Sequence, residues 1–510
     1  MNPKFYITTS IAYVNARPHI GFAMEVIQAD VLARYHRLLG EDTFYLTGTD
    51  EHGMKLEQTA KEQGVIPQQL VDENSGYFRA LGRLLNLSNN DFIRTTDEHH
   101  IKGARKIWSK MVETGDMYKG SYEGLYCIGC ESFKTEKEIV DGVCPLHKRP
   151  LEKIKEENYF FKLSKYSETI KKRIQDGQLV ILPEARKHEI LSVLEDGLKD
   201  VSFSRPKKIL EWGIEVPDDP DQVMYVWCDA LSNYITGAGY GSDEEKFKKY
   251  WPADVHLIGK DILRFHSAIW IGMLLSAGIQ LPRAIYVHGF ITSEGMKMSK
   301  SLNNVVDPVT VVEQFSADAL RYFLLKEIPT TDDGDFSKER FKVVYESELA
   351  DTYGNLVSRV LAMTHKYFEG KVPEVSDMNE IASYGIEFER FWKSYDEAIS
   401  RFDLKVALEL TMATAMNANQ FVEANKPWAL AKTDQVALSR VIYVLLEMIR
   451  LTSVALLPFI PSTAQKVLAY LGQGEVFSYG NDRKWRQLKA GTQIEKAEPL
   501  FPKVQENVSA

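Results

Sequence analysis

The spacing of apolar residues predicts alternating strands and helices over the first part of the chain. Strand-like runs at 5–11 (FYITTSI) and 42–50 (DTFYLTGTD) flank the segment 22–40, whose apolar residues recur at helical spacing. Strands that alternate with helices form parallel sheets covered by helices. We therefore expect residues 1–115 to form the first half of a Rossmann-like α/β domain.

The pattern changes at about residue 116, where a Cys/His cluster is followed by NYFFKLSKY at 158–166 and then by charged helical sequence. Strand-like runs return at 223–227, 254–259 and 284–290. We therefore expect a connective insertion at 116–204 within the sheet domain, whose second half is 205–281.

From about residue 346 the apolar spacing is helical, and strand-like runs are almost absent. Pro and Gly punctuate this region at NKPW, LPFIPS and LGQGE, as they do between helices. We expect a linking region at 282–345, an α-helical bundle at 346–480 and a tail at 481–510. The predicted fold is therefore a parallel-sheet α/β domain with an insertion, followed by an α-helical bundle.

The sequence argues against a membrane protein and against a secreted protein built on disulfides. The longest apolar stretch, 441–460, is interrupted by Glu447 and Arg450, and the N-terminus lacks the basic-then-apolar order of a signal peptide. Four cysteines in 510 residues are too few for a disulfide framework. A net charge of −9 argues against unspecific coating of nucleic acid but leaves a local RNA-binding face open. We expect a cytoplasmic protein without a membrane span, and a monomer because no dimerisation domain follows the bundle.

The segment ARPHIGF at 16–22 places His19 and Gly21 where a strand hands over to a helix. A helix N-terminus offers free N–H groups to phosphate, Gly21 would let the phosphate approach, and His19 would donate from its ring. A phosphate-binding His-Ile-Gly-His signature would have a second histidine at position 22, but this chain has Phe22. Taken alone, such a motif is more often structural.

A second motif, KMSKS at 297–301, carries Lys297, Ser299 and Lys300 between Gly- and Asn-containing segments. Two ammonium groups on a movable loop can follow the β- and γ-phosphates of a nucleotide as pyrophosphate leaves. The alternative is a solvated basic turn before a helix.

The insertion contains two paired half-sites, Cys127-x-x-Cys130 and Cys144-x-x-His147. Thiolates and an imidazole at this spacing can close a tetrahedral Zn²⁺ site that has no open position and therefore serves the fold. The alternative is a small core of reduced cysteines.

Together these motifs resemble the class I aminoacyl-tRNA synthetases, and among them the bacterial-type methionyl-tRNA synthetases with a single zinc knuckle. The resemblance runs from the first strand to about residue 501. It implies ATP-dependent ligation of L-methionine to tRNA(Met) through a methionyl-adenylate, with Mg²⁺ accompanying ATP and one structural Zn²⁺ per chain. The ATP-binding residues that it implies are His19, Gly21, Phe22, Lys297, Ser299 and Lys300, with His19, Gly21, Lys297 and Lys300 as the catalytic set.

The resemblance also implies a methionine pocket, in which Asp50 binds the ammonium group and Arg205 lies near the substrates. An exposed basic patch would explain Arg205 equally well. The implied pocket walls are Ile11, Tyr13, Trp227, Ala230, Tyr234, Ile262, His266 and Trp270. The last three are spaced i, i+4, i+8 and would share one helix face, as a plain core stripe also would.

In the predicted bundle, Asn355 and Arg359 are spaced i, i+4, and Trp428 follows Pro427 near a predicted helix start. Unpaired RNA bases are recognised by stacking on aromatic rings and by hydrogen bonds to their edges. In isolation these residues would more often be packing and surface residues. The resemblance implies that they bind the tRNA anticodon.

Two other functions use part of the same motif set. A nucleotidylyltransferase shares the His-x-Gly chemistry but has no use for the long helical region. A catalytically weak or silent tRNA-binding paralogue would keep that region, and Phe22 is the residue that favours it.

Overall fold

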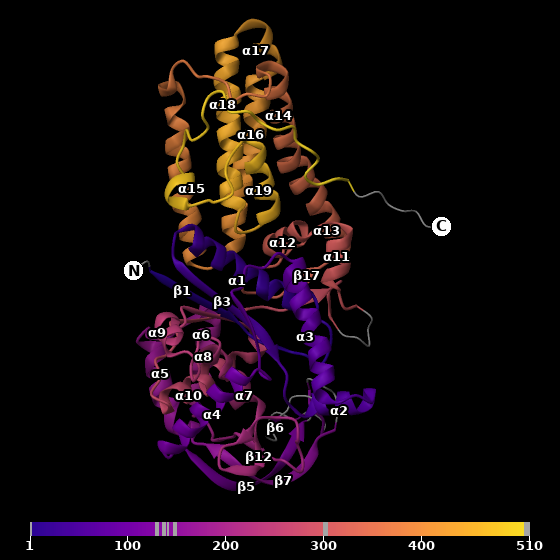
Figure 1. Ribbon diagram of the computed structural model, residues 1–510, viewed down its shortest axis with the longest axis vertical. Coiled ribbons are helices and arrows are strands. Elements are labelled where there is room, and N and C mark those ends of the chain that lie inside the picture. The colour runs from indigo at the N-terminus through magenta and orange to yellow at the C-terminus, as the bar shows by residue number, and fades with distance from the viewer. Residues whose placement is uncertain are drawn as a thin grey trace, which may run out of the picture.

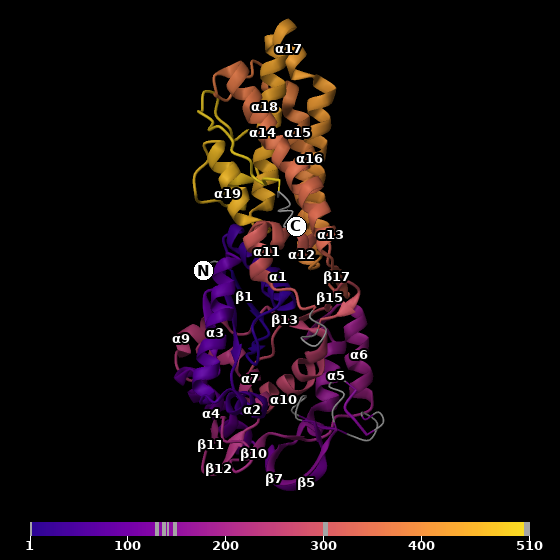
Figure 2. The same ribbon diagram turned by 90° about the vertical axis from the view of Figure 1, so that its right-hand side faces the viewer.

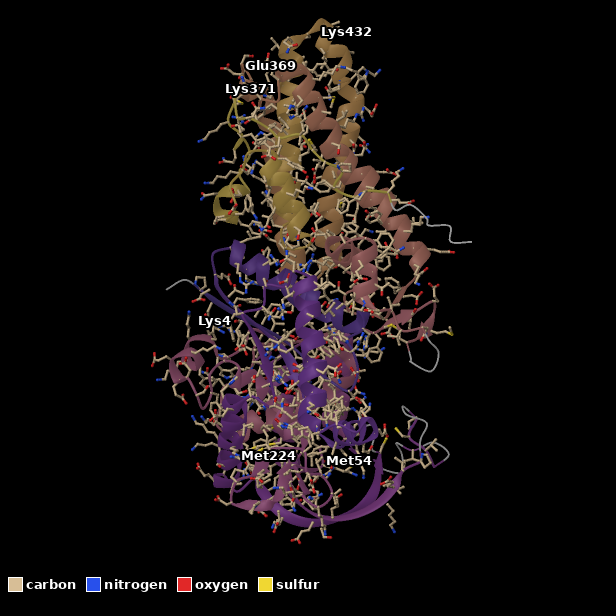
Figure 3. All side chains as sticks on the ribbon, turned by 45° about the vertical axis from the view of Figure 1, so that its right-hand side comes forward. Lys4, Met54, Met224, Glu369, Lys371 and Lys432 are labelled. Atoms are coloured by element: carbon tan, nitrogen blue, oxygen red, sulfur yellow. The ribbon has the colours of Figure 1, made fainter. Side chains whose placement is uncertain are left out.

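The computed structural model describes residues 3–127, 132–134, 139, 142–145, 150–298 and 304–503. The molecule is elongated, with a sheet domain at one end and a helical bundle at the other (Figures 1 and 2). Lys432 lies at the tip of the bundle, whereas Met54 and Met224 lie near the opposite end (Figure 3).

A seven-stranded sheet forms the centre of the first domain, and every recorded strand pair in it is parallel. The order is β2-β3-β1-β13-β14-β8, with β4 beside β3. Inner strands such as β13 and β14 are buried along their whole length, as expected for parallel strands covered on both faces. The strands are β1 (Lys4–Thr9), β2 (Ala12–Tyr13), β3 (Asp42–Asp50), β4 (Asp91–Arg94), β8 (Val180–Leu182), β13 (Val255–Gly259) and β14 (Ala284–His288).

Helices cover both faces of this sheet (Figure 1). The central one is α1 (Ile20–Leu38), which is buried along most of its length and so lies inside the molecule. The other helices of this domain are α2 (Met54–Gln63), α3 (Pro67–Leu84), α4 (Glu98–Glu113), α5 (Ser167–Gln175), α6 (Glu184–Glu195), α7 (Val226–Leu231), α8 (Asn233–Thr236), α9 (Glu244–Tyr250) and α10 (Ile271–Ser276).

The predicted insertion contains a separate antiparallel sheet of order β6-β5-β7-β9, and a three-stranded sheet of order β10-β12-β11 follows it. Within the segment 116–204, however, β8 pairs with β14 and forms an edge of the main sheet, so part of this segment belongs to the sheet domain. The strands of these two smaller sheets are β5 (Met117–Cys127), β6 (Ser132–Lys134), β7 (Glu152–Phe161), β9 (Val201–Ser202), β10 (Ser204–Pro206), β11 (Glu215–Val216) and β12 (Asp219–Met224).

The linking region combines a small sheet of order β16-β15-β17 with three helices. In sequence order its elements are β15 (Ile291–Ser293), β16 (Met296–Lys297), α11 (Pro308–Gln314), α12 (Ala317–Lys326), β17 (Gly334–Phe336) and α13 (Lys338–Val344). A π-helix at Tyr345–Gly354 then leads into the bundle.

The bundle explains the charged residues within the longest apolar stretch. Arg450 Nη2 lies 2.8 Å from Glu447 Oε2, and both side chains are buried in α18. No helix in the described part of the chain is long and apolar enough to cross a membrane. The helices of the bundle and tail are α14 (Asn355–Phe368), α15 (Ala382–Ser400), α16 (Leu404–Asn425), α17 (Pro427–Thr433), α18 (Gln435–Leu456), α19 (Pro461–Tyr470) and α20 (Tyr479–Asp482). A parallel-sheet α/β domain followed by a helical bundle confirms the predicted fold class.

Candidate active site

The N-terminus of α1 is built by His19 and Gly21. His19 is the N-cap residue, and its Nδ1 accepts a hydrogen bond from the N–H group of Gly21 at 3.0 Å. A neutral His19 ring therefore carries its proton on Nε2, where it can be donated to a ligand. A Cβ atom on Gly21 would lie 2.8 Å from His19 Cε1, so glycine leaves room for this ring position.

The segment after the lysine motif meets this helix start. The N–H group of Ile20 donates to the carbonyl oxygen of Val306 at 3.2 Å, which attaches the segment after the lysine motif to the start of α1. Lys297 lies in β16, in register with Thr292 of β15. Ser299 and Lys300 lie outside the described residues.

Phe22 has a packing role that the sequence did not reveal. Its half-buried ring contacts Phe78 edge to face, with ring centroids 4.9 Å apart. It also lines a cavity of about 190 Å³ together with Thr47 and Phe92. Phe22 therefore helps to anchor the first turn of α1 to α3.

The predicted methionine-binding residues gather near the carboxyl ends of β1 and β3. Tyr13 of β2 is in register with Asp50, the last residue of β3. Ile11 and Trp227 pack against the buried Ala230 in one apolar cluster. The Trp227 ring stacks on Phe265, a residue absent from the prediction, with centroids 3.6 Å apart and an interplanar angle of 9°.

A second group of predicted residues is joined through Tyr234. Its Oη lies 2.6 Å from His266 Nε2, and His266 Nδ1 lies 2.9 Å from the carbonyl oxygen of Ile262. The carbonyl can only accept, so Nδ1 carries the proton of the neutral ring and Nε2 accepts from the tyrosine hydroxyl. Burial lowers the pKa of His266 to about 4, which keeps the ring neutral at neutral pH. Trp270 is fully buried beside Tyr234, with ring centroids 5.7 Å apart.

The helix expected through Ile262, His266 and Trp270 is not regular. Lys260–Ile262 is a 3₁₀ turn and Phe265–Trp270 is a π-helix, so the turn length changes between them. π-Helical turns are rare and frequently occur at functional sites. Tyr234 contacts both His266 and Trp270, with ring centroids 5.6 and 5.7 Å apart.

Arg205 is buried, which excludes the exposed basic patch considered from the sequence. Its guanidinium carbon lies 4.3 Å from the ring centroid of Tyr225, directly before α7 and its Trp227. Its Nη1 donates to Ser202 Oγ at 2.7 Å and to the carbonyl oxygen of Ser204 at 2.9 Å. Arg205 is therefore held rigidly next to the helix that carries part of the predicted pocket.

Two buried polar groups near this sheet edge were missed from the sequence. Asp229 of α7 accepts from His52 Nδ1 at 2.6 Å and from His100 Nε2 at 2.8 Å. Glu25 of α1 lies 2.9 Å from His288 Nε2, and although burial opposes it, this carboxylate raises the pKa of His288. The signal for Glu25 was a carboxylate inside an apolar helical run.

Half of the predicted metal ligands are described. Cys127 ends β5, and both it and Cys144 are buried. Cys130 and His147 lie outside the described residues. Among all the residues that the structure describes, no three His, Cys, Asp or Glu side chains are grouped so that they could hold a metal ion.

The predicted anticodon-binding residues belong to the bundle: Asn355 begins α14, Arg359 lies one turn further along it, and Trp428 lies in α17, the helix at the tip in Figure 1. Arg359 of α14 lies over the ring of Trp428, at 5.3 Å from its centroid, and its Nη1 is 2.7 Å from Glu423 Oε1. Trp428 is 40% exposed and Asn355 is exposed as well. Trp428 is therefore a surface residue rather than a core residue.

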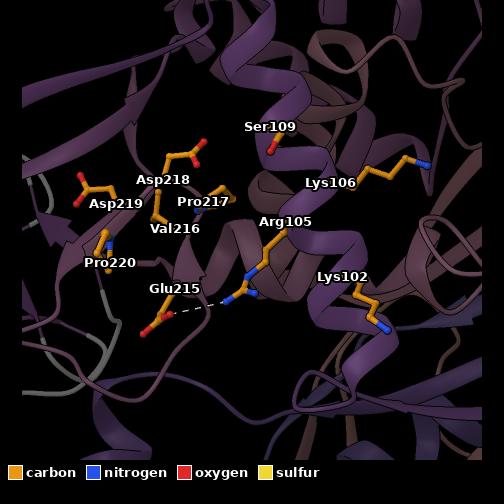
Figure 4. A pocket seen from close by; sticks show the side chains of 10 residues that line it. All are labelled: Lys102, Arg105, Lys106, Ser109, Glu215, Val216, Pro217, Asp218, Asp219 and Pro220. Atoms are coloured by element: carbon orange, nitrogen blue, oxygen red, sulfur yellow. Dashed lines mark ion pairs between the residues drawn. The ribbon is translucent and has the colours of Figure 1, made fainter.

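A cavity of about 520 Å³ lies elsewhere, between α4 and the β11–β12 hairpin (Figure 4). Arg105 faces Glu215 across it, with Arg105 Nη2 3.9 Å from Glu215 Oε2. None of its ten lining residues belongs to the predicted site. This cavity is therefore separate from the predicted active site.

Comparison with known proteins identifies the family. A family model described as tRNA synthetases class I (M) matches residues 5–153 and 137–361, and one described as the anticodon binding domain of methionyl tRNA ligase matches 372–510. The methionine-tRNA ligase of Thermotoga maritima is 43% identical over 98% of this chain and 80% of its own length. The methionine-tRNA ligase of Brucella suis biovar 1 is 42% identical over 98% of both chains.

Solved structures agree with this assignment. The Mycobacterium tuberculosis methionyl-tRNA synthetase in complex with methionyl-adenylate superposes with a TM-score of 0.93 at 39% identity, covering 98% of this chain and all of that one. Sequence similarity and fold lead to one conclusion. The chain belongs to the methionyl-tRNA synthetase (methionine-tRNA ligase) family of class I.

Proposed function

We propose that this enzyme forms methionyl-adenylate at the carboxyl edge of its main sheet and then transfers the methionyl group to tRNA(Met), releasing AMP and pyrophosphate. The observation that supports the proposal is the hydrogen bond from the N–H group of Ile20 to the carbonyl oxygen of Val306, because it attaches the segment that follows the lysine motif to the start of α1. Nothing in the comparisons supports a silent paralogue.

In the first step a methionine carboxylate oxygen attacks the α-phosphorus of ATP, and the bond from that phosphorus to the bridging oxygen breaks as pyrophosphate leaves. The nucleophile is already an anion, so the protein needs to position the reactants and stabilise phosphate charge. His19 Nε2, Lys297, Ser299 and Lys300 would do so, since the N–H groups of Gly21 and Phe22 already donate to Nδ1 and to the carbonyl oxygen of His19. Mg²⁺ bound with ATP would neutralise part of the phosphate charge.

Methionine selection would use the residues around Tyr234. Asp50 would bind the ammonium group, and the aromatic and apolar side chains around Trp227 would contact the polarizable thioether. A neutral His266, fixed by Tyr234, fits an uncharged ligand side chain better than an imidazolium would. Arg205 would lie near the substrates.

The insertion would bind one structural Zn²⁺ through Cys127, Cys130, Cys144 and His147. Two of these residues are buried thiols of the same insertion, which fits a closed site with a role in folding. Cys144→Ser should lower the zinc content of the purified protein and its melting temperature, because a structural metal contributes folding free energy. Cys228→Ser is the control, and an unchanged zinc content in Cys144→Ser would contradict the ligand assignment.

The far end of the bundle would bind the anticodon through Asn355, Arg359 and Trp428. The exposed Trp428 ring beside an arginine supports this assignment, since unpaired bases stack on such surfaces. We further propose the domain division given above, a monomeric state and a cytoplasmic location.

The test is amino-acid-dependent exchange of pyrophosphate into ATP, run with each of the twenty amino acids and without tRNA. We expect exchange with methionine alone. A protein that binds tRNA(Met) but gives no exchange with any amino acid would be a silent paralogue, and exchange that requires a phosphate-containing acceptor in place of an amino acid would indicate a nucleotidylyltransferase.

A further inference from the structure

One buried guanidinium joins the sheet domain to the bundle. Arg321 of α12 is fully buried, and its Nη2 lies 2.8 Å from Asp30 Oδ2 in α1. Its Nε donates to the carbonyl oxygen of Phe459 at 2.7 Å, and its Nη2 donates to that of Pro458 at 2.8 Å. Its Nη1 donates to the carbonyl oxygen of Leu85 at 3.3 Å. Arg321 therefore links α1, the end of α3 and the turn between α18 and α19.

The buried Asp30 carboxylate accepts hydrogen bonds from Arg321 and from two other side chains. Asp30 is fully buried and also contacts Arg34 Nε at 2.7 Å and Ser88 Oγ at 2.6 Å. Although burial alone would raise it, Arg321 and Arg34 hold the pKa of Asp30 below its ordinary value. Charge-assisted bonds from a planar guanidinium fix direction as well as distance. Burial and directionality make this contact a rigid joint.

Weaker links surround the joint. Asp318 of α12 accepts a hydrogen bond from the backbone N–H group of Thr463 in α19. Tyr35 of α1 donates to Asp396 Oδ1 of α15 at 2.8 Å, and Asn86 Nδ2 lies 3.1 Å from Ser462 Oγ. Several elements of the bundle are thus attached to α1 and its neighbours.

The position of α1 gives this joint a functional meaning. The helix begins beside His19 in the predicted ATP site, and Asp30 and Tyr35 lie in its second half. In Figures 1 and 2, α1 lies where the sheet domain meets the bundle, while α17 with Trp428 lies at the opposite tip. The orientation of the bundle relative to the ATP site therefore depends on contacts along α1.

We propose that Arg321 is a positioning residue for the tRNA-dependent step. By holding the α18–α19 turn against α1, it sets the angle at which tRNA bound at the bundle tip presents its acceptor end to the adenylate. The inference rests on the proposed function. It predicts that Arg321 matters little for adenylate formation, because that step uses the sheet domain and the lysine motif and not the bundle.

The chain supplies a matched control in Arg450. This arginine is equally buried, pairs with Glu447, and donates from Nη1 to the carbonyl oxygen of Asp482 at 2.7 Å and from Nη2 to that of Lys484 at 2.5 Å. All its partners lie within the bundle and tail. Arg450→Lys should therefore disturb packing about as much as Arg321→Lys without loosening the joint.

The experiment measures kcat/KM for methionine-dependent pyrophosphate exchange and for tRNA(Met) charging in the wild type, Arg321→Lys and Arg450→Lys, together with melting temperatures. A misplacement of about 1 Å can lower a rate about 100-fold. For Arg321→Lys we expect charging to fall at least about tenfold with exchange within about twofold of the wild type. For Arg450→Lys we expect the ratio of the two activities to stay unchanged.

Equal losses of charging relative to exchange in both variants would overturn the inference, and so would an unchanged ratio in Arg321→Lys. If Arg321→Lys does not fold, the same two activities are measured in Tyr35→Phe and Asn86→Ala. Each of these substitutions removes one hydrogen bond between the bundle and the region around Arg321. A selective loss of charging in these variants supports the joint, and an unchanged ratio contradicts it. A wild-type protein without exchange would instead refute the proposed function.

Discussion

The two ends of the molecule hold their predicted binding residues in different ways. At the sheet edge, Tyr234, His266 and Trp270 are buried and fixed by hydrogen bonds and ring contacts from several elements. At the bundle tip, Trp428 is exposed and contacts Arg359 through its ring face. A small apolar ligand requires a preformed pocket, whereas an RNA loop can adapt to a surface. Substitutions at the sheet edge should therefore cost stability and activity together, and those at the tip should affect only the tRNA-dependent step.

The largest expected effect is that of Trp270→Ala. Truncation of a fully buried tryptophan costs about 3–5 kcal/mol of folding free energy, and the variant should also lose methionine-dependent exchange. Trp108→Ala is the control, because Trp108 is buried in the same core but lies outside the predicted pocket. Chemical denaturation and exchange kinetics at a temperature where both variants are folded should show a raised KM for methionine only in Trp270→Ala. Equal kinetics would make Trp270 a plain core residue.

His266 should make the stability of the sheet domain depend on pH. Its pKa of about 4 in the folded protein lies below the ordinary value of 6.5, so the neutral form is favoured by folding. The stabilisation is complete above about pH 6.5 and is lost as the pH falls towards 4, to a total of about 3 kcal/mol. Unfolding free energies measured across this range should fall less steeply for His266→Gln than for the wild type. Identical slopes would show that His266 titrates normally.

Trp428→Ala should lower tRNA charging without affecting adenylate formation. Loss of one base-stacking platform costs about 1–3 kcal/mol of tRNA binding, whereas adenylate formation does not involve the bundle tip. We expect normal exchange, a normal melting temperature and reduced charging of tRNA(Met). The control is Trp392→Ala, which removes a buried ring that donates to the carbonyl oxygen of Arg483 at 3.1 Å and should lower the melting temperature. A parallel loss of exchange and thermal stability in Trp428→Ala would remove it from the anticodon site.

The smallest effect is expected for Phe22→His. A ring N–H group at this position adds a phosphate donor, so exchange should stay equal or become faster. The contact with Phe78 is weakened, at a cost of about 0.5–1.5 kcal/mol of stability. Phe22→Leu, which adds no donor, should lose similar stability without any gain in rate. A folded but inactive Phe22→His would mean that the aromatic contact fixes the start of α1.

Local patterns predicted the fold class and the residues that lie close together in sequence, because hydrophobic spacing and short motifs depend on neighbouring positions. They could not reveal Asp229 between His52 and His100, or Arg321 between α1 and the bundle, since these groups meet only after folding. The π-helix at Phe265–Trp270 was also missed, because helix periodicity was assumed to be regular.

The most direct test of the division between the two ends uses the wild-type protein and two transcripts of tRNA(Met), one with the CAU anticodon and one with an altered anticodon. Exchange without tRNA measures the sheet edge, and charging of each transcript measures the bundle tip. We expect methionine-dependent exchange together with a fall in charging kcat/KM of about 100-fold or more for the altered transcript. Equal charging of both transcripts would contradict the assignment of anticodon recognition to the bundle tip.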